Sequence, residues 1–343
     1  MVGFKRAQNQ IVTSTMTQKV FVTREIPQEG LDMMREKFEV TVWPSEYPPS
    51  KQELIEMAKD CQGLVTLLSD LIDDEVISML PNLKVIAQYA VGYDNIDVKE
   101  ATRRGIIVTN TPGVLTEATA DLAWSLIMSV SRRIVEADQY VRCGKWSVAW
   151  GPQLLLGSDV FGATLGIIGM GRIGQAVAKR AGGFNMNVLY HTRSHSDGLE
   201  EIEKSVGAKA TGLDTLLHES DIVSLHVPLT SKTHHMIGRR QLETMKAGSI
   251  LINTSRGSVI DQDALCDAIV SGHLGGAGLD VFEEEPLSRD SALLKLSNVV
   301  LVPHIGSATT KTRATMALMC ATNIIAALGD EKPPNIVNPE VLQ

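Results

Sequence analysis

The most constraining feature of the sequence is a glycine-rich turn that joins an apolar run to a segment rich in alanine and valine. Residues 164–178 read TLGIIGMGRIGQAVA and contain G-x-G-x-x-G. In this pattern Gly169 permits a tight turn, Gly171 lets the backbone approach a pyrophosphate, and Gly174 lets a helix pack closely on a strand. The amide groups and the positive dipole end of that helix then face the anion. The turn therefore predicts a βα unit that binds a dinucleotide.

The rest of the chain alternates β-branched runs with helical periodicity. Strands are predicted over Lys19–Thr23, Leu64–Leu68, Val85–Ala87, Ile106–Val108, Thr164–Ile168, Asn187–Tyr190, Asp221–Val227, Ser249–Asn253, Gly276–Val281 and Val299–Leu301. Helices are predicted over Gly30–Lys37, from Asp73 to Pro81, and over Ile96–Arg103, Thr116–Arg142, Ile173–Arg180, Asp263–Ser271 and Thr309–Leu328, before an extended tail. Such alternation favours parallel sheets with helices on both faces. We therefore expect two α/β domains, each a doubly wound parallel sheet.

Length and composition limit the class of protein. The 343 residues suffice for two domains, and 44% hydrophobic with 21% charged residues is typical of globular chains. A formal net charge of −8 argues against nucleic acid or an anionic membrane surface as the main partner. The best apolar candidate for a membrane span, Leu122–Ser131, has ten residues, whereas a span needs ~20. We therefore expect no membrane or nucleic-acid partner.

Cysteine spacing and the N-terminal segment indicate the cellular compartment in which the protein is expected. The four cysteines, Cys61, Cys143, Cys266 and Cys320, are far apart and form no C-x-x-C, so we expect no disulfide framework, no metal site and a reducing environment. Residues 1–18 lack acidic residues and are rich in Ser and Thr, which is faintly typical of a mitochondrial transit segment. Because they have no apolar stripe, we expect a disordered extension of a cytoplasmic protein, with organelle targeting left open.

The end of the second strand after the glycine turn indicates which nicotinamide cofactor is used. NAD-binding turns place a carboxylate there, about 20 residues after the glycines, to hold the ribose 2′-hydroxyl. Here the strand ends in VLYHTRSH, without a carboxylate. Arg193 can pair with a 2′-phosphate and Ser194 can donate to it. The sequence therefore predicts a preference for NADP(H), with NAD(H) possible; the alternative is that Arg193 is a solvated loop residue.

Three polar residues each follow a predicted strand in the second half of the chain. Arg256 lies in NTSRG, Glu285 in DVFEEEP and His304 in VPHIGS. Ligands of open α/β sheets bind outside the carboxyl ends of the strands. For a carbonyl substrate with a carboxylate, Arg256 would hold the carboxylate, His304 would protonate the carbonyl oxygen as hydride arrives, and Glu285 would orient His304 and favour its protonated form. Taken singly, the three could instead be a turn cap, a solvated acid and a buried histidine.

Four stretches of the sequence resemble the D-isomer-specific 2-hydroxyacid dehydrogenases. They are GIIGMGRIGQAVAKR, INTSRGSVIDQDAL, GAGLDVFEEEPL and LVPHIGSAT, and the likeness extends over 19–338. In that family the last three stretches carry a catalytic Arg, Glu and His, which here are Arg256, Glu285 and His304. The resemblance implies a Rossmann nucleotide domain, 119–305, inserted into a flavodoxin-like substrate domain made of 19–118 and 306–343. It also implies a homodimer with the helix and loop after Thr116 at the interface.

Within this family the chain is most similar to the glyoxylate/hydroxypyruvate reductases. The stretches LLSD (67–70), YAVGYDNI (89–96) and GKWSVAW (144–150) resemble substrate loops of that group. The likeness implies NADPH-dependent reduction of glyoxylate to glycolate and of hydroxypyruvate to D-glycerate. It implies that the substrate is bound by Val91, Gly92, Arg256, Ser307 and Trp146, the last reaching the neighbouring subunit's site. It also implies cofactor contacts from Gly169, Gly171, Arg172, Ile173, Gly174, Arg193, Ser194, Val227, Thr254, Asp280 and Gly306.

Two other functions stay open at this stage. The chain could be another D-2-hydroxyacid dehydrogenase that acts on a different 2-oxo acid, such as a phosphoglycerate or aromatic-lactate dehydrogenase. It could also resemble the family's transcriptional corepressors, which keep the fold as a nucleotide-sensing scaffold. Turnover of a 2-oxo acid separates both kinds of enzyme from the scaffold.

Overall fold

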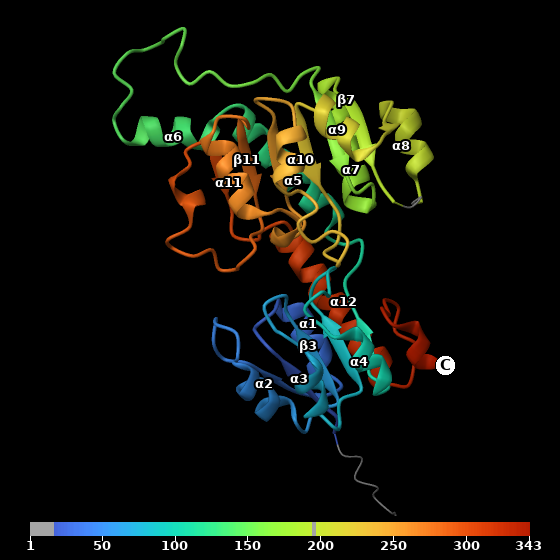
Figure 1. Cartoon of the computed structure of the whole chain (residues 1–343). Helices are drawn as coiled ribbons and strands as arrows, with labels where there is room; N and C mark the ends of the chain where they lie inside the picture. The colour runs from blue at the N-terminus through green and yellow to red at the C-terminus, as the bar shows by residue number, and fades with distance from the viewer. Residues whose placement is uncertain (1–16, 194–196) are drawn as a thin grey trace, which may run out of the picture. The chain divides into compact units, whose positions relative to one another are not determined.

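The computed structural model describes residues 17–193 and 197–343 and divides the chain into two compact units (Figure 1). Unit 1 comprises 17–111 and Met316–Gln343, and unit 2 comprises Pro112–Thr315. In each unit, the described strands form one sheet in which neighbouring strands pair in parallel. The expected fold class, two doubly wound parallel-sheet domains, is confirmed.

Unit 1 is built on a five-stranded sheet in the order β2-β1-β3-β4-β5. Its strands are β1 Lys19–Val22, β2 Glu39–Val42, β3 Gly63–Thr66, β4 Val85–Gln88 and β5 Ile107–Thr109. Every residue of β3 and β4 is buried, whereas the edge strand β2 alternates exposed and half-buried residues. Because central strands of a parallel sheet are covered on both faces, they form continuous apolar runs, and the edge strand EVTV gives a weaker signal.

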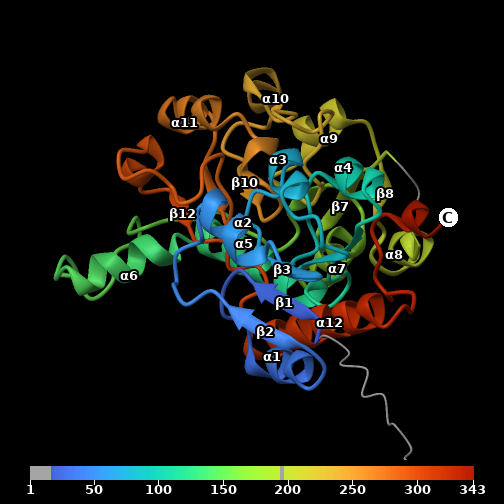
Figure 2. The same ribbon diagram turned by 90° about the horizontal axis from the view of Figure 1, so that it is seen from below.

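Helices cover both faces of the unit 1 sheet (Figure 2). On one face lie α2 Lys51–Ala58, α3 Asp74–Ser78 and α4 Val98–Arg103, whose buried side chains share a core with Phe21 of β1. On the other lie α1 Gln28–Arg35 and the part of α12 (Thr310–Leu328) that begins at Met316. These two helices pack so closely that a Cβ on Gly30 would lie 2.6 Å from the carbonyl carbon of Ala317. Ser50, Asp73 and Asp97 cap the N-termini of α2, α3 and α4.

Unit 2 is built on a seven-stranded sheet in the order β12-β11-β10-β9-β6-β7-β8. Its strands are β6 Thr164–Ile168, β7 Asn187–His191, β8 Lys209–Ala210, β9 Ile222–Leu225, β10 Ile250–Asn253, β11 Gly276–Leu279 and β12 Val299–Leu301. This is the Rossmann strand order with one further edge strand. The order reverses between β6 and β9, and such sheets bind ligands in the crevice beyond the strand ends at that point.

Helices on each face of the unit 2 sheet hold it together. α5 Thr116–Ser131, α7 Arg172–Ala181 and α8 Leu199–Val206 lie on one face, and α9 Leu213–Glu219, α10 Arg239–Thr244 and α11 Gln262–Val270 on the other. Short 3-10 turns occupy Gly182–Phe184, Gly257–Val259, Ala292–Lys295 and Pro339–Leu342. Trp124 of α5 stacks on Phe184 and donates its indole N–H to the Val177 carbonyl at 3.0 Å. These contacts place all of α5 in unit 2.

The prediction of a single helix over 116–142 is wrong. The helix breaks at Arg133, whose φ of 52° is left-handed, and α6 follows as Ile134–Arg142. The segment contains neither Gly nor Pro, so the break comes from tertiary contacts: the Ser131 carbonyl accepts the Ser158 amide at 2.8 Å, and the Arg133 guanidinium donates to the Leu156 carbonyl at 3.3 Å. α6 has no buried residue and projects from the unit (Figure 1).

The C-terminal tail is anchored along the edge of the unit 1 sheet. Asn338 is fully buried, accepts the Val108 amide at 2.8 Å and donates to the Ile106 carbonyl at 3.0 Å. The Val337 amide donates to the Val108 carbonyl at 2.8 Å. The tail thus occupies backbone groups that the edge strand β5 would otherwise leave unpaired.

Two further properties concern the described residues only. None of their helices has both the length and the apolar character needed to cross a membrane. The four cysteines are free, with Cys61, Cys266 and Cys320 buried and Cys143 exposed.

Candidate active site

The glycine-rich turn follows β6, where the strand order reverses. Gly169 has a φ of 95°, which favours glycine, and its amide donates to the His191 carbonyl at 2.8 Å. A Cβ on Gly174 would overlap the Gly169 carbonyl oxygen, whereas a Cβ on Gly171 would meet nothing within 4 Å. Among the described residues, no side chain caps the first turn of α7. This open face and the uncapped amide groups fit a bound pyrophosphate.

Other predicted cofactor residues lie around the same strand ends. Arg172 and Ile173 begin α7, and Val227 is half-buried after β9. The Thr254 hydroxyl, just after β10, is buried and has no hydrogen-bond partner among the described residues. Since buried polar groups are usually paired, an orphaned hydroxyl at this edge also fits a ligand that supplies its partner.

The end of β7 carries the residues predicted to select the cofactor. Arg193 is exposed two residues beyond the strand, and β7 itself contains no carboxylate. The next acid, Asp197, is exposed, and its carbonyl accepts the Gln175 side chain at 2.9 Å. Ser194 lies outside the described residues.

Asp280 follows β11 and holds the turn that carries His304. Its side chain is 1% exposed and accepts the amides of Ile305 at 2.6 Å and Gly306 at 2.8 Å. Its carbonyl accepts the His304 amide at 2.9 Å. Burial raises the pKa of Asp280 to about 6, against the opposing effects of these amides and of the His304 charge. The buried carboxyl thus fixes the His304 backbone, which is left-handed with a φ of 53°.

His304 and Glu285 form a close pair. His304 Nδ1 lies 2.8 Å from Glu285 Oε2, while Glu285 Oε1 accepts the Phe282 amide at 3.0 Å. Burial raises the pKa of Glu285, but the His304 hydrogen bond and charge, the Phe282 amide and the Arg256 charge lower it below its usual value overall. The Glu285 carboxylate therefore stays ionised and accepts a hydrogen bond from the Nδ1–H of His304.

Arg256 lies near this pair on a turn shaped by Asn253. Asn253, fully buried at the end of β10, donates to the Arg256 carbonyl at 2.8 Å and accepts the amide of Ser255 at 3.0 Å. The Arg256 guanidinium donates to the Ser255 carbonyl at 2.8 Å and is close enough to Glu285 to lower the pKa of that carboxyl. The structure thus brings together the predicted arginine, glutamate and histidine, which sequence spacing alone leaves apart.

Sequence reasoning missed the residues that support these side chains. Asn253 is one, although an Asn directly before a turn is a known turn-forming signal. In unit 1, Gln88 is another: it is fully buried and donates to the Gly92 carbonyl at 3.2 Å and to Asn95 at 2.8 Å. It lies at the end of a strand that reads as continuously apolar apart from this residue, and that exception is the available signal.

The remaining predicted substrate residues lie elsewhere in the chain. Val91 and Gly92 are half-buried in unit 1, after β4, and the Val91 carbonyl accepts the Asn110 side chain at 2.8 Å. Ser307 is half-buried, three residues before α12 begins. Trp146 is 54% exposed on the segment after α6, outside the group of strand-end residues.

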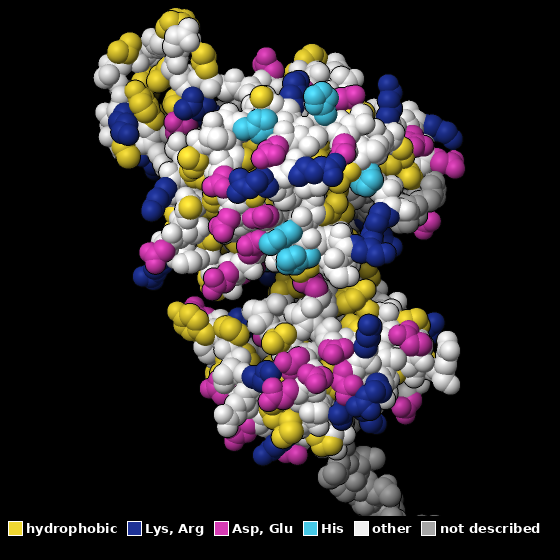
Figure 3. All heavy atoms as spheres, viewed as in Figure 1, with side chains coloured by type: hydrophobic (Ala, Val, Ile, Leu, Met, Phe, Trp, Pro, Cys, Tyr) yellow, Lys and Arg dark blue, Asp and Glu magenta, His cyan; other side chains and the backbone are white. Residues whose placement is uncertain are grey.

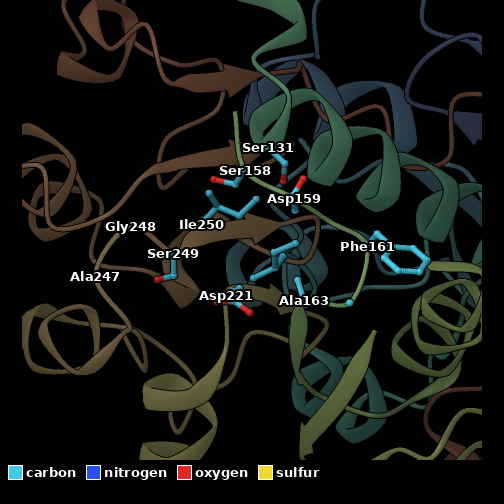
Figure 4. Close-up of a pocket in the computed structure, with 12 residues that line it drawn as sticks. Ser131, Ser158, Asp159, Phe161, Ala163, Asp221, Ala247, Gly248, Ser249 and Ile250 are labelled. Atoms are coloured by element: carbon cyan, nitrogen blue, oxygen red, sulfur yellow. The ribbon is translucent and has the colours of Figure 1, made fainter. Parts of the chain in front are cut away.

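A separate pocket lies at the opposite end of the unit 2 strands, where β6, β9 and β10 begin (Figure 4). Its volume is about 340 Å³, and its lining includes Ser131, Asp221 and Ser249. None of the predicted site residues that the structure describes lines it. The pocket therefore plays no part in the site described above.

Comparison with known proteins identifies the family. Residues 124–306 match the model of the D-isomer specific 2-hydroxyacid dehydrogenase NAD binding domain. The chain belongs to the D-isomer-specific 2-hydroxyacid dehydrogenases. A relative of this dehydrogenase from Korarchaeum cryptofilum (strain OPF8), named glyoxylate reductase, is 59% identical over 328 residues, which cover 96% of this chain and 98% of that protein.

Solved structures agree with this assignment. A Thermus thermophilus protein is 48% identical, with a TM-score of 0.87 and coverage of 93% of this chain and 100% of that one. An NADPH-dependent glyoxylate/hydroxypyruvate reductase from Sinorhizobium meliloti, in complex with NADP and malonate, is 32% identical with a TM-score of 0.83, covering 94% and 97%. The sequence-based resemblance is thus confirmed, and this dehydrogenase is an oxidoreductase of small 2-hydroxy or 2-oxo acids with a dinucleotide-binding Rossmann domain.

Proposed function

We propose that this dehydrogenase reduces glyoxylate to glycolate and hydroxypyruvate to D-glycerate, with NADPH as reductant. The observation that carries the proposal is the His304–Glu285 pair beside Arg256, at the strand ends of the sheet that bears the dinucleotide turn. The names of the relatives support the substrate class, since the Korarchaeum protein is called glyoxylate reductase and the Sinorhizobium protein glyoxylate/hydroxypyruvate reductase.

Each side chain then has a role that follows from its chemistry. The Arg256 guanidinium binds the substrate carboxylate, and by family resemblance the amides of Val91 and Gly92 bind it too. NADPH, when bound, supplies hydride to the 2-oxo carbon. His304 Nδ1 faces Glu285, so Nε2 is the atom that gives its proton to the carbonyl oxygen. Glu285 keeps the ring oriented and stabilises its charged form before transfer.

The preference for NADPH rests on the end of β7. A carboxylate there would repel a 2′-phosphate, and β7 has none. The exposed Arg193 guanidinium can reach out to pair with two phosphate oxygens. The Sinorhizobium relative, described as NADPH-dependent, supports the same preference.

The test is steady-state turnover. Purified protein is mixed with glyoxylate or hydroxypyruvate, and loss of absorbance is followed with NADPH and with NADH. We expect fast NADPH oxidation that His304→Ala loses. A folded protein that binds NADPH and turns over neither substrate would overturn the assignment, and would favour another 2-oxo acid or a corepressor-like scaffold.

We also propose that a second copy of the chain covers an exposed apolar surface on α6 and the segment 143–161, here called the arm. Apolar side chains gather over this projecting part (Figure 3). They include Ile134, Val141, Trp146, Val148, Trp150, Leu156 and Phe161, with Trp150 76% exposed. An apolar surface of this kind marks a protein interface rather than a solvated face.

The dimer is tested by light scattering after gel filtration. We expect a dimer that Trp150→Ser with Leu156→Ser converts to a monomer, while Leu294→Ser, at an exposed apolar residue outside the arm, has no effect. If Trp146 reaches the neighbouring subunit's site, as the family resemblance implies, Trp146→Ala raises KM for the 2-oxo acid in the dimer. A wild-type monomer would contradict the proposal.

A further inference from the structure

A second histidine–glutamate pair lies next to the first in the sequence. His235 Nε2 is 2.6 Å from Glu283 Oε1, and Glu283 is two residues before Glu285. The two side chains are 41% and 33% exposed, so the pair is at the surface of unit 2. On the face of unit 2 seen in Figure 3, histidine side chains lie beside a group of acidic side chains.

The backbone at His235 is held in an uncommon conformation. Its φ is 49°, close to the 53° of His304. Left-handed residues with side chains persist only where their surroundings hold them, and they gather at functional sites. At His235 the amide donates to the Ser258 carbonyl at 2.8 Å, and two residues later the Ile237 amide donates to the Val259 carbonyl at 3.1 Å. The His235 segment is therefore fastened to the turn that follows Arg256.

Glu283 fastens that same turn to the segment that bears Glu285. Besides contacting His235, Glu283 Oε1 accepts the Gln262 amide at 3.3 Å. The two segments also touch directly, because a Cβ on Gly257 would overlap the backbone of Phe282. Three loops thus meet at one junction, and two of them carry Arg256 and Glu285.

We propose that His235 and Glu283 are positioning residues, which keep the turn of Arg256 and the turn of Glu285 in register for the reaction proposed above; the inference rests on that function. They act through the backbone of the residues that bind the carboxylate and orient His304. Reactions of this kind are sensitive to placement, and a shift of about 1 Å in a reacting group can cost roughly 100-fold in rate. An exposed pair outside the strand-end group can therefore control turnover.

Four variants of His235 and Glu283 and one control variant test the contribution of this pair. His235→Asn removes the contact because Asn is too short, yet it keeps the left-handed backbone, which Asn adopts readily. Glu283→Ala removes the acceptor, and the double variant removes both. Glu283→Gln retains an acceptor oxygen for His235 and for the Gln262 amide. Glu284→Ala is the matched control, since Glu284 is an exposed acid of the same segment whose side chain makes no hydrogen bond or ion pair within the described residues.

We expect His235→Asn and Glu283→Ala each to lower kcat for glyoxylate roughly tenfold, with KM for NADPH unchanged. The double variant should fall no further than either single variant, because the two residues act as one unit. Glu283→Gln should keep most of the activity and Glu284→Ala all of it. Additive losses, or a loss in Glu284→Ala as large as in Glu283→Ala, would overturn the proposal.

Amide hydrogen exchange tests the positioning role of His235 and Glu283 independently of the proposed substrate. In the protein without substrate, His235→Asn and Glu283→Ala should speed amide exchange in 256–262 and 282–286 while the melting temperature stays within a few degrees. If the wild-type protein fails to reduce glyoxylate but the variants show these changes in exchange, the proposed substrate is wrong and the junction stands. If the wild type is active and both kcat and exchange are unaffected, the junction has no positioning role.

Discussion

Replacing Glu285 by Gln should slow the reaction in a way that depends on pH. The substitution keeps a side chain of the same size at 2.8 Å from His304 Nδ1 but removes its charge. In the native protein, burial raises the pKa of Glu285, and the interactions with His304 lower it by more. An ionised carboxylate accepts a charge-assisted hydrogen bond from the ring, and a neutral amide accepts a weaker one.

The size of the effect follows from the exposure of the pair. A hydrogen bond to a charged group contributes about 1.5–3 kcal/mol. The side chains of His304 and Glu285 are 28% and 37% exposed, so solvent screens their interaction and the lower end of this range applies. About 1.4 kcal/mol is a factor of ten in an equilibrium. We therefore expect Glu285→Gln to weaken the contact that orients His304 and to lower kcat/KM about tenfold at neutral pH.

The assay is a pH profile of kcat/KM for glyoxylate with saturating NADPH. Because the pKa of Glu285 is lowered, its charge is present at neutral pH and is lost only when the pH falls below the usual range of a glutamate. The wild type should therefore approach the variant in acid, while the difference persists at neutral and alkaline pH. Glu284→Gln, in the same acidic run, serves as the control. A loss of equal size at every pH would refute the reasoning, because it would indicate displaced geometry rather than a lost charge.

Cofactor selection, the glycine turn and the anchored tail each give a further expected outcome. Arg193→Ala should raise KM for NADPH roughly tenfold, because it removes about one hydrogen bond to a charged group, and should leave KM for NADH unchanged. Equal effects on both cofactors would contradict a 2′-phosphate contact. Gly174→Ala should lower the free energy of unfolding by about 1–3 kcal/mol and weaken NADPH binding in a fluorescence titration, whereas Gly183→Ala, where a Cβ meets nothing within 4 Å, should do neither. Asn338→Ala should lower the free energy of unfolding in urea by about 2–3 kcal/mol, because it leaves buried backbone groups unpaired; an unchanged urea midpoint would show that the tail does not stabilise unit 1.

The sequence predicts the fold best where both faces of a strand are covered. β3, β4, β9 and β10 are buried at every residue, and each lies within or overlaps a predicted apolar run. The strands β2 and β8 and the short helices α2 and α8 to α10 are absent from the prediction, since elements with exposed residues mix polar and apolar side chains. The break before α6 depends on contacts with 156–158, far along the chain, so no local pattern indicates it.

The sequence predicts which residues form the candidate site, but not the contacts that bring them together. The rule that ligands bind at strand ends selects Arg256, Glu285 and His304, because each follows an apolar strand. Their convergence depends on the Asp280 carboxyl, which fixes the His304 backbone through hydrogen bonds across 25 residues of sequence. Likewise, nothing local distinguishes the three glutamates at 283–285, which have different partners only in the folded protein.

The division of α12 between the two units has a consequence for how the protein is made. All five strands of unit 1 precede unit 2 in the chain, but the helix residues that pack on Gly30, and the Asn338 anchor, come after it. Chains are synthesised from the N-terminus at about 5–20 residues per second. The first unit to leave the ribosome is therefore the last to be completed, and one face of its sheet is covered by α1 without α12 while unit 2 is translated. Unit 2 is continuous in the chain and can fold during that interval. A nascent chain halted near Thr315 would therefore contain one folded unit and one incomplete unit to which chaperones can bind.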